Sequence, residues 1–202
     1  MANRSVLAAL ALCAVTLALW AAALAGCSKE TPPPAAKPTP TPAAKPTQAQ
    51  APTPAPAGLE VVILAGGCFW GMEDLLRDIP GVVETVVGYD IEAEAVKVTF
   101  DPERLPLSKL LEDWYFKMHD PTTPSRQGND VGIQYRSAIF FTTPEQRRVA
   151  EEVKARVGAS GFWKAPIVTE IVAAGPFTTA EEYHQDYLEK NPDGYTCHYL
   201  RD

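Results

Sequence analysis

The chain has 202 residues, of which 46% are hydrophobic and 21% are charged, and its formal net charge at pH 7 is −7. This length accommodates a leader segment and one domain with a substantial core. Binding to phosphate groups needs clustered Lys and Arg, so the acidic charge excludes nucleic acid as a partner.

Residues 1–26 have the pattern of an export signal, because Arg4 is followed by a long run of Ala, Leu and Val. The run ends in Leu24-Ala25-Gly26-Cys27, which resembles a bacterial lipoprotein signal, in which the cysteine is lipidated after cleavage. We therefore expect a signal peptide at 1–26, a lipid on Cys27, and an exported protein anchored in a membrane and facing the periplasm or the cell exterior. An uncleaved membrane-spanning anchor is the alternative, since the apolar run is long enough to cross a bilayer.

The segment after the signal is rich in proline. Residues 28–57 contain ten prolines, eight alanines and five threonines, a composition that cannot build a hydrophobic core. Proline at this density favours extended polyproline II conformations. We expect residues 27–57 to be a disordered tether that starts at the lipidated cysteine, with a peptide-recognition tract as the alternative. The folded domain is then expected at 58–202.

The domain alternates strand-like and helix-like patterns. Helices are expected after Cys68, over 107–118, after Thr143 and over 180–189, with capping boxes at Thr143 to Gln146 and at Thr178 to Glu181. A short polar link between the second and third expected strands predicts an antiparallel hairpin. This order predicts an α/β fold, a two-layer sandwich with a mixed, largely antiparallel sheet flanked by helices. The expected strands are 59–65, 82–89, 94–100, 135–141 and 167–173.

One cysteine, Cys68, stands between glycines and aromatic residues at the predicted junction of the first strand and helix, in the sequence GGCFWG. Unpaired backbone N–H groups and the helix dipole stabilise a thiolate at a helix N-terminus. We therefore expect the pKa of Cys68 to lie below its ordinary value and the thiol to be reactive. A buried structural cysteine in a strand-to-helix turn is the alternative.

A second cysteine, Cys197, is the partner available to Cys68 once the signal is removed and Cys27 carries a lipid. A structural disulfide is the ordinary interpretation for an exported domain. However, Cys197 follows the turn formers of Asn191-Pro192-Asp193-Gly194, which predict a mobile polar tail. A reactive thiol and a thiol on a flexible arm suit a catalytic pair, in which the second resolves the oxidised form of the first.

The longest irregular stretch is expected from His119 to Gln134, and loops of this length are usually functional or disordered. Asp130 and Tyr135 can bring a carboxylate and a phenol to one place, so we interpret this loop as functional, with a solvated loop as the alternative. The three histidines lack metal-ligand spacing with the cysteines and are expected to be structural or surface residues. No metal site is predicted, and the absence of a phosphate-binding or dinucleotide fingerprint predicts no bound cofactor.

Three motifs now point to one family: GCFWG at 67–71, HDPTTPSRQGNDVGIQYRS at 119–137 and EEYHQDYLEKNPDGYTC at 181–197. In this order they resemble the A type of peptide methionine sulfoxide reductase, and the resemblance covers residues 59–200. It implies an enzyme that reduces the S epimer of methionine sulfoxide in proteins and peptides, with thioredoxin or a similar external dithiol as reductant. Together with the signal, it implies a monomeric, membrane-tethered repair enzyme.

The resemblance also assigns roles to the thiols and aromatic residues. Cys68 would attack the sulfoxide and become a sulfenic acid, and Cys197 would then form a disulfide with it. Phe69 and Trp70 would form an apolar wall around the S-methyl group of the substrate.

Proton delivery is assigned in the same way. Glu94 matches the glutamate of the family and would be the acid, with a pKa raised by burial. Glu92 is the rival, because two residues apart on one strand point to the same face. Tyr135 would hydrogen-bond the sulfoxide oxygen, and Asp130 would polarise or position the site.

The chain departs from the family before Glu94. Members usually carry a long Gly-rich loop there, with a second active-site tyrosine, whereas this chain has only the four residues of Asp90–Ala93. We therefore expect oxygen stabilisation to depend more on Tyr135 and Glu94, and the cleft to be more open to large substrates. One alternative is a catalytically impaired lipoprotein that binds oxidised peptides. Another is a general thiol-disulfide oxidoreductase, which the missing C-x-x-C pair disfavours.

Overall fold

The computed structural model describes residues 57–202. The predicted signal peptide, Cys27 and the predicted tether up to residue 56 lie outside the described residues. Within residues 57–202, no helix combines the length and the apolar character that a bilayer crossing requires.

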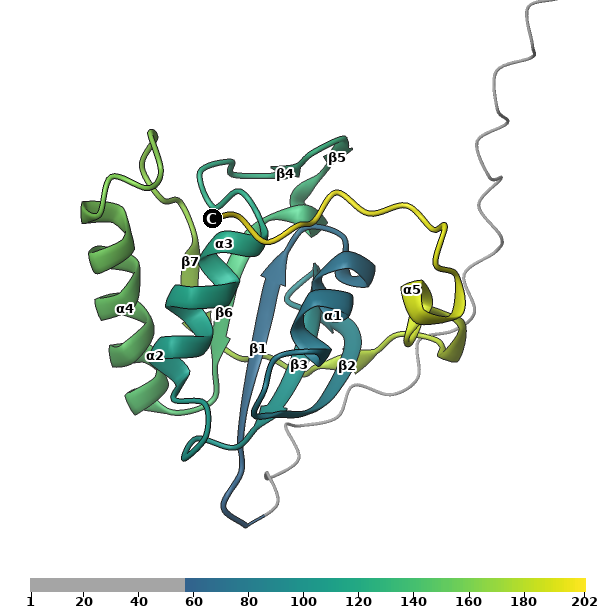
Figure 1. The fold of residues 1–202 in the computed structure, drawn as a ribbon, viewed down its shortest axis with the longest axis horizontal. Coiled ribbons are helices and arrows are strands. Elements are labelled where there is room, and N and C mark those ends of the chain that lie inside the picture. Colours follow the sequence, from purple (N-terminus) through teal and green to yellow (C-terminus); the bar gives the residue numbers. More distant parts are fainter. Residues whose placement is uncertain (1–56) are drawn as a thin grey trace, which may run out of the picture. The chain divides into compact units, whose positions relative to one another are not determined.

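A six-stranded sheet with the order β7-β6-β1-β3-β2-β8 forms the centre of the fold (Figure 1). β6 and β7 are parallel, and every other neighbouring pair in this sheet is antiparallel. The predicted mixed, largely antiparallel sheet is thus confirmed, and so is the predicted hairpin of β2 and β3. Two further short strands, β4 and β5, form a separate hairpin. The strands are β1 Glu60–Gly66, β2 Val82–Asp90, β3 Ala93–Phe100, β4 Arg126–Gln127, β5 Asp130–Val131, β6 Ser137–Phe141, β7 Glu170–Ala173 and β8 Thr178–Thr179.

The longer helices cover one face of this sheet (Figure 1). Residues 107–118 form one helical run, as predicted, whose middle part, η1, is a π-helix. Leu110 and Leu111 from this run, Met72 from α1 and Val153 from α4 pack together in the main core. The helical segments are α1 Phe69–Arg77, α2 Leu107–Lys109, η1 Leu110–Tyr115, α3 Phe116–Met118, η2 Ile133–Tyr135, α4 Pro144–Ala159, η3 Glu182–His184 and α5 Tyr187–Lys190.

The two faces of the sheet are separated by the alternation of side chains along each strand. In β1, Val62 and Leu64 point to the helices, whereas Ile63 and Ala65 belong to a second, smaller core. This second core is covered by the segment that leads from β7 to β8, which crosses behind the sheet from one edge to the other and contributes Phe177 (Figure 1). The layers are therefore helices, sheet and one crossing segment.

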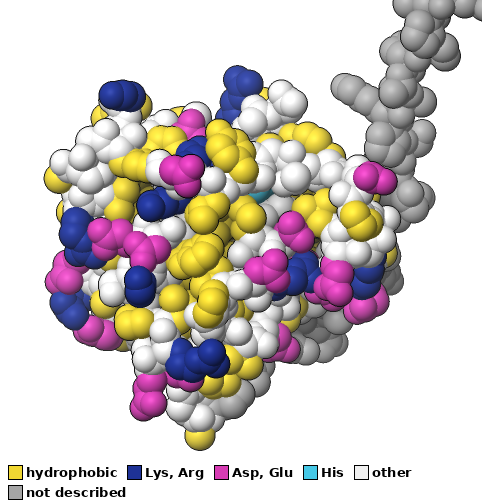
Figure 2. Space-filling view, viewed as in Figure 1, with side chains coloured by type: hydrophobic (Ala, Val, Ile, Leu, Met, Phe, Trp, Pro, Cys, Tyr) yellow, Lys and Arg dark blue, Asp and Glu magenta, His cyan; other side chains and the backbone are white. Residues whose placement is uncertain are grey.

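The surface over the helical layer shows no separation of charge by sign. On the face seen in Figure 2, hydrophobic side chains gather in the middle, and acidic and basic side chains lie next to one another towards the edges. Along α4, Arg147 pairs with Glu151, and Arg148 pairs with both Glu145 and Glu152. Pairs as exposed as these contribute little to stability.

The start of α4 follows the prediction closely. The Thr143 hydroxyl accepts the N–H of Gln146 at 3.2 Å, and Pro144 occupies the first turn. The Gln146 side-chain oxygen in turn accepts the backbone N–H of Thr142 at 2.9 Å, one residue before the cap. The predicted capping box is therefore present, except that the Gln146 side chain binds the N–H of Thr142 rather than that of the cap residue Thr143.

Other boundaries differ from the prediction. The strand expected at 167–173 begins only at Glu170, and the strand expected from Tyr135 begins at Ser137. Tyr135 instead ends the short 3-10 turn η2. The predicted functional loop therefore reaches two residues further than expected, and the first of these two residues is the candidate Tyr135.

The helix expected over residues 180–189 is wrong. The Gln185 side chain binds both the N–H and the C=O of Val87 on β2, and Asp186 adopts a left-handed conformation with φ of 52°. A residue with this φ interrupts an α-helix. The segment is thus split into η3 and α5, and the expected cap Thr178 pairs with the edge of β2 as part of β8.

Candidate active site

Cys68 lies where the central strand β1 runs into α1. It is the N-cap residue of α1, as predicted, and its side chain is buried. The preceding Gly67 has φ of 110°, a conformation that other residues rarely adopt, and this allows the chain to turn directly from strand into helix. The thiol is therefore fixed by the sheet on one side and by the helix on the other.

The expected lowering of the Cys68 pKa is wrong. Burial is the largest cause and, together with the nearby Glu94 and Asp130 carboxylates, raises the pKa of this thiol to about 12. The backbone N–H of Trp70 does donate toward Cys68 and lowers the pKa, as the helix N-terminus predicts, but this effect is smaller than desolvation. In the substrate-free site Cys68 is therefore a neutral thiol.

Glu94 faces Cys68 from the sheet. It has the same parity along β3 as Val96 and Val98, which point to the helices. The backbone N–H of Phe69 donates to the Glu94 carboxylate at 3.2 Å. Burial raises the pKa of Glu94 to about 7, as predicted for an acid, with this hydrogen bond opposing the shift. The rival Glu92 is exposed in the turn before β3 and does not share a strand face with Glu94.

Tyr135 and Asp130 reach the same place from the long loop. Asp130 opens β5 and Tyr135 closes η2. Burial is the largest cause that raises the pKa of Tyr135 to about 12, and the nearby Glu94 and Asp130 carboxylates raise it in the same direction. Because Asp130 also accepts a hydrogen bond from the Cys197 thiol, the loop is folded against the site rather than solvated.

Cys197 belongs to the same cluster. Its thiol donates to the Asp130 carboxylate at 3.5 Å, and the Tyr195 hydroxyl donates to the same oxygen at 3.2 Å. The tail was expected to be mobile, but here it is docked: it runs across the upper end of α1 toward α3, where Arg201 binds the carbonyl of Lys117 (Figure 1). Cys68 and Cys197 are both free thiols, so the structure shows the reduced site.

The two predicted aromatic residues are part of a larger wall. The Phe69 ring lies 5.7 Å from that of Tyr89 and 5.3 Å from that of His184. Trp70 stacks on Tyr187 at 3.8 Å and donates from its indole nitrogen to His184 at 3.1 Å. Tyr89 was not predicted as a site residue, although its position opposite Glu94 in the predicted hairpin was a usable signal.

A two-residue turn joins β2 and β3 at the place where the resemblance implies a long loop. Ile91 and Glu92 both have positive φ, of 42° and 63°, as in the tight hairpin turns of type I′. Such φ values are unfavourable for a β-branched residue. The turn is held by Arg136, which is 5% exposed and donates to the carbonyls of both Ile91 and Ile133. One guanidinium thus joins the hairpin that carries Glu94 to the turn that carries Tyr135.

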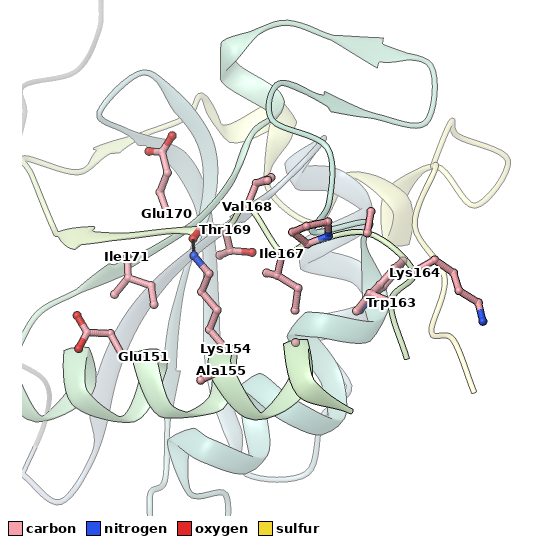
Figure 3. A pocket seen from close by; sticks show the side chains of 13 residues that line it. Glu151, Lys154, Ala155, Trp163, Lys164, Ile167, Val168, Thr169, Glu170 and Ile171 are labelled. Carbon is pink, nitrogen blue, oxygen red and sulfur yellow. Dashed lines mark hydrogen bonds between the residues drawn. The ribbon is translucent and has the colours of Figure 1, made fainter. Parts of the chain in front are cut away.

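A large groove on the described surface lies away from these residues. It has a volume of about 870 Å³ and runs between α4 and the segment 163–171. Lys154 extends across it from α4 and donates to the carbonyl of Thr169, as Figure 3 shows. None of the predicted site residues lines it. Among residues 57–202, no group of three or more His, Cys, Asp or Glu side chains is placed to hold a metal ion.

Comparison with known sequences identifies the family. The sequence profile described as "Peptide methionine sulfoxide reductase" matches residues 60–91 and 90–202. The chain belongs to the peptide methionine sulfoxide reductase family. The two matched segments of this reductase meet at the turn of Ile91 and Glu92.

Named relatives agree with the profile. The chain is 53% identical over 155 residues to peptide methionine sulfoxide reductase MsrA 1 of Mesorhizobium japonicum, covering 70% of this chain and 90% of that one. It is 55% identical over 155 residues to the MsrA of Leifsonia xyli, covering 70% and 91%.

Solved structures of the family share the fold. Mxr1 of Saccharomyces cerevisiae in its reduced form superposes with a TM-score of 0.64 at 35% identity, covering 73% of this chain and 94% of that one. Methionine sulfoxide reductase A of Corynebacterium diphtheriae superposes with a TM-score of 0.60 at 35% identity, covering 70% and 79%.

Proposed function

We propose that this chain reduces the S epimer of methionine sulfoxide in exported proteins and peptides, with Cys68 as nucleophile, Glu94 as acid and Cys197 as resolving thiol. Membership of the family gives the reaction class, thiol-dependent reduction of methionine sulfoxide. The observation that carries the roles is the hydrogen bond from the Phe69 amide to Glu94, which keeps the carboxyl group beside the Cys68 thiol.

In the first step the Cys68 sulfur attacks the sulfoxide sulfur, while the Glu94 carboxyl group protonates the sulfoxide oxygen. The oxygen passes to Cys68, which becomes a sulfenic acid, and methionine is released. The thiol proton of Cys68 replaces the proton that Glu94 gave up, so no net proton is consumed. A neutral resting thiol therefore fits this step.

The other site residues bind the sulfoxide oxygen, receive the methyl group and position the tail. Tyr135 donates its hydroxyl to the sulfoxide oxygen, and its raised pKa keeps the phenol protonated at neutral pH. Phe69 and Trp70 receive the methyl group against the aromatic wall described above. Asp130 accepts from Tyr195 and Cys197 and so positions the tail over the site.

In the second step the Cys197 thiol attacks the Cys68 sulfenic acid, water leaves and a disulfide forms. An external dithiol of the thioredoxin kind then reduces the disulfide by two exchange reactions and is itself oxidised. The geometry favours this enzyme over a peptide-binding lipoprotein without activity, because the acid and both thiols still lie together despite the short turn.

One assay tests the proposal. The reduced chain is incubated separately with the S and the R sulfoxide of a methionine-containing peptide, and methionine and free thiols are counted. The S sulfoxide should yield methionine together with loss of the Cys68 and Cys197 thiols, and the R sulfoxide should yield neither. If the S sulfoxide also yields neither product, the enzyme assignment is wrong.

The membrane anchor is a separate proposal. The small residues before Cys27 and the proline-rich residues 28–57 support an exported lipoprotein with a tethered domain that acts as a monomer facing the periplasm or the cell exterior. Cells given a labelled fatty acid should incorporate the label into the wild-type chain and not into Cys27→Ala. Equal labelling of the two chains would contradict lipidation at this residue.

A further inference from the structure

A buried imidazole borders the resolving thiol. His198 directly follows Cys197, is 7% exposed, and has its Nδ1 atom 3.6 Å from the Cys197 sulfur. Its other ring nitrogen, Nε2, lies 2.8 Å from the carbonyl oxygen of Gly66 at the end of β1. The two reaction steps described above leave this side chain without a role.

The contact with Gly66 fixes which nitrogen carries the hydrogen. A carbonyl oxygen only accepts hydrogen bonds, so Nε2 must donate, and Nδ1 of the neutral ring keeps a free lone pair. Burial lowers the pKa of His198 to about 4, so the ring is neutral at pH 7. A proton acceptor therefore faces the Cys197 thiol.

The glycines of the Cys68 motif provide the space in which the ring lies. A Cβ atom on Gly71 would lie 2.6 Å from His198 Nδ1, and one on Gly67 would lie 3.1 Å from His198 Cε1. The backbone N–H of His198 also donates to the Thr196 hydroxyl at 3.1 Å. The position of the ring is thus specified by β1, α1 and the tail together.

The charges around Cys197 and His198 favour transfer of the thiol proton to the imidazole ring. Asp130 lies on the other side of Cys197, and burial together with this carboxylate raises the pKa of the thiol to about 11. Only about one part in 10⁴ of such a thiol is ionised at pH 7. A proton moved to Nδ1 leaves the thiolate beside an imidazolium, which Asp130 also stabilises, against the opposing effect of Arg201. The Tyr195 hydroxyl beside Cys197 lowers the pKa of the thiol and so favours the thiolate. His119 is itself kept neutral by burial, with its pKa lowered to about 3.

The geometry points to His198 as the general base of disulfide formation, taking the Cys197 proton on Nδ1 as the Cys197 sulfur attacks the sulfenic acid of Cys68. The S–S bond forms, the S–O bond breaks, and the hydroxyl group leaves with a proton as water. Cys197 sulfur is oxidised and Cys68 sulfur is reduced, and the proton taken by His198 balances the one that the hydroxyl group receives. This inference rests on the resolving role proposed for Cys197.

The variant His198→Gln distinguishes the role of His198 as a base from its hydrogen bond to the Gly66 carbonyl. Its side-chain amide nitrogen can still donate to the Gly66 carbonyl, but nothing replaces the acceptor at Nδ1. In a single turnover of the full chain with a peptide S-sulfoxide, methionine formation reports the first step and the loss of two thiols reports the second. At about pH 7 the second step should slow by about 10²-fold or more, which is typical of a lost general base.

The pH profile distinguishes a base from a structural residue. In His198→Gln the second step should accelerate about tenfold per pH unit as the thiolate fraction grows, whereas the wild-type rate should change little between the pKa values of His198 and Cys197. The difference between the two proteins therefore narrows at high pH. A gap of constant size, or no gap, would overturn the inference.

Two other outcomes are also decisive. If the wild type forms methionine but no disulfide with Cys197, the proposed function is at fault rather than the role of His198. If the variant does not fold, the wild-type profile alone decides, because a rate that rises about tenfold per pH unit near neutrality shows an unassisted thiolate and contradicts a base.

Discussion

The two cysteines occupy contrasting regions of one site. Cys68 lies at the junction of β1 and α1, whose residues belong to the main core. Cys197 lies in residues 191–202, a tail without helix or strand. Side-chain contacts hold this tail in place, from Cys197 to Asp130, from His198 to Gly66 and from Arg201 to Lys117.

The contrast matches what each thiol has to do. A nucleophile must meet the substrate at a fixed distance from its acid, and packing in a core fixes position to a fraction of an ångström. A resolving thiol must move toward the oxidised sulfur. Each polar contact of the tail contributes only about 1 kcal/mol net, so the tail can leave its place and return.

The largest expected effect separates the two thiols directly. Cys68→Ser should form no methionine, because no other sulfur reaches the substrate. Cys197→Ser should release one equivalent of methionine per enzyme and then stop when a thioredoxin-like dithiol is the reductant. Rapid quenching followed by quantification of methionine measures both. Continuous turnover by Cys197→Ser with that reductant would break the contrast between the two regions.

A second effect concerns Glu94, the proposed acid, which lies on β3 beside Cys68. Glu94→Gln should lower the rate of the first turnover by about 10²- to 10⁴-fold, because it removes the proton donor. In the wild type this rate should fall as the pH rises through about 7, where Glu94 loses its proton, and the variant should lack this dependence. Glu92→Gln is the matched control, exposed in the turn, and should behave as wild type. A large loss of rate in the control would reverse the assignment.

The same substitution should alter stability. The pKa of Glu94 is raised from 4.5 to about 7, so its contribution to stability is present below about pH 4.5 and is lost as the pH rises through about 7. Glu94→Gln should therefore raise the free energy of unfolding at about pH 8 by up to about 3 kcal/mol and change it little at about pH 4. Urea unfolding at both pH values measures this. Equal effects at the two pH values would show that burial does not penalise the charged form.

A smaller effect tests the docking of the tail. Gly71→Ala places a Cβ atom 2.6 Å from His198 Nδ1 and closer still to the Thr196 hydroxyl, so the tail must shift. Disulfide formation should slow by about tenfold, corresponding to about 1.4 kcal/mol. Gly158→Ala on α4, where nothing lies within 4 Å, is the control and should leave the rate unchanged. An unchanged rate in Gly71→Ala would show that the docked position is not the productive one.

The smallest effect concerns the turn beside Glu94. Replacing Ile91 and Glu92 by Asn and Gly should stabilise the fold by about 1 kcal/mol or slightly more, because these residues accept positive φ. The first-turnover rate should stay within about twofold, since Arg136 binds a backbone carbonyl that both sequences provide. Loss of stability in this variant would mean that the Ile91 side chain contributes packing that its exposure conceals.

Local patterns predicted the elements near the site well. The first strand, the capping residues of α4 and the hairpin of β2 and β3 each follow from side chains close in sequence, and the structure agrees with them. Glu94 is identified through the family resemblance, and the expected rise of its pKa by burial is confirmed.

Long-range effects were not predictable in this way. The helix N-terminus indicates the sign of one influence on Cys68, but the larger desolvation depends on residues brought from β3, the loop and the tail. The prediction of the last helix is wrong because the Gln185 side chain binds the backbone of Val87, about a hundred positions earlier in the chain. Spacing alone predicts a structural or surface role for His198. One of its ring partners, Gly66, is 132 positions away in the sequence and the other, Cys197, is its direct neighbour, so neither contact produces a periodic pattern.

The two-residue turn at Ile91 has a consequence for how this enzyme family can vary. The buried face of the sheet specifies the register of β2 and β3, so a longer connection that keeps this register leaves Tyr89 opposite Glu94. Shortening a loop also lowers the entropic cost of closing it, which grows only with the logarithm of its length. The turn is therefore a natural insertion point. Segments grafted there from longer relatives should change which substrates gain access while the acid and the nucleophile keep their places.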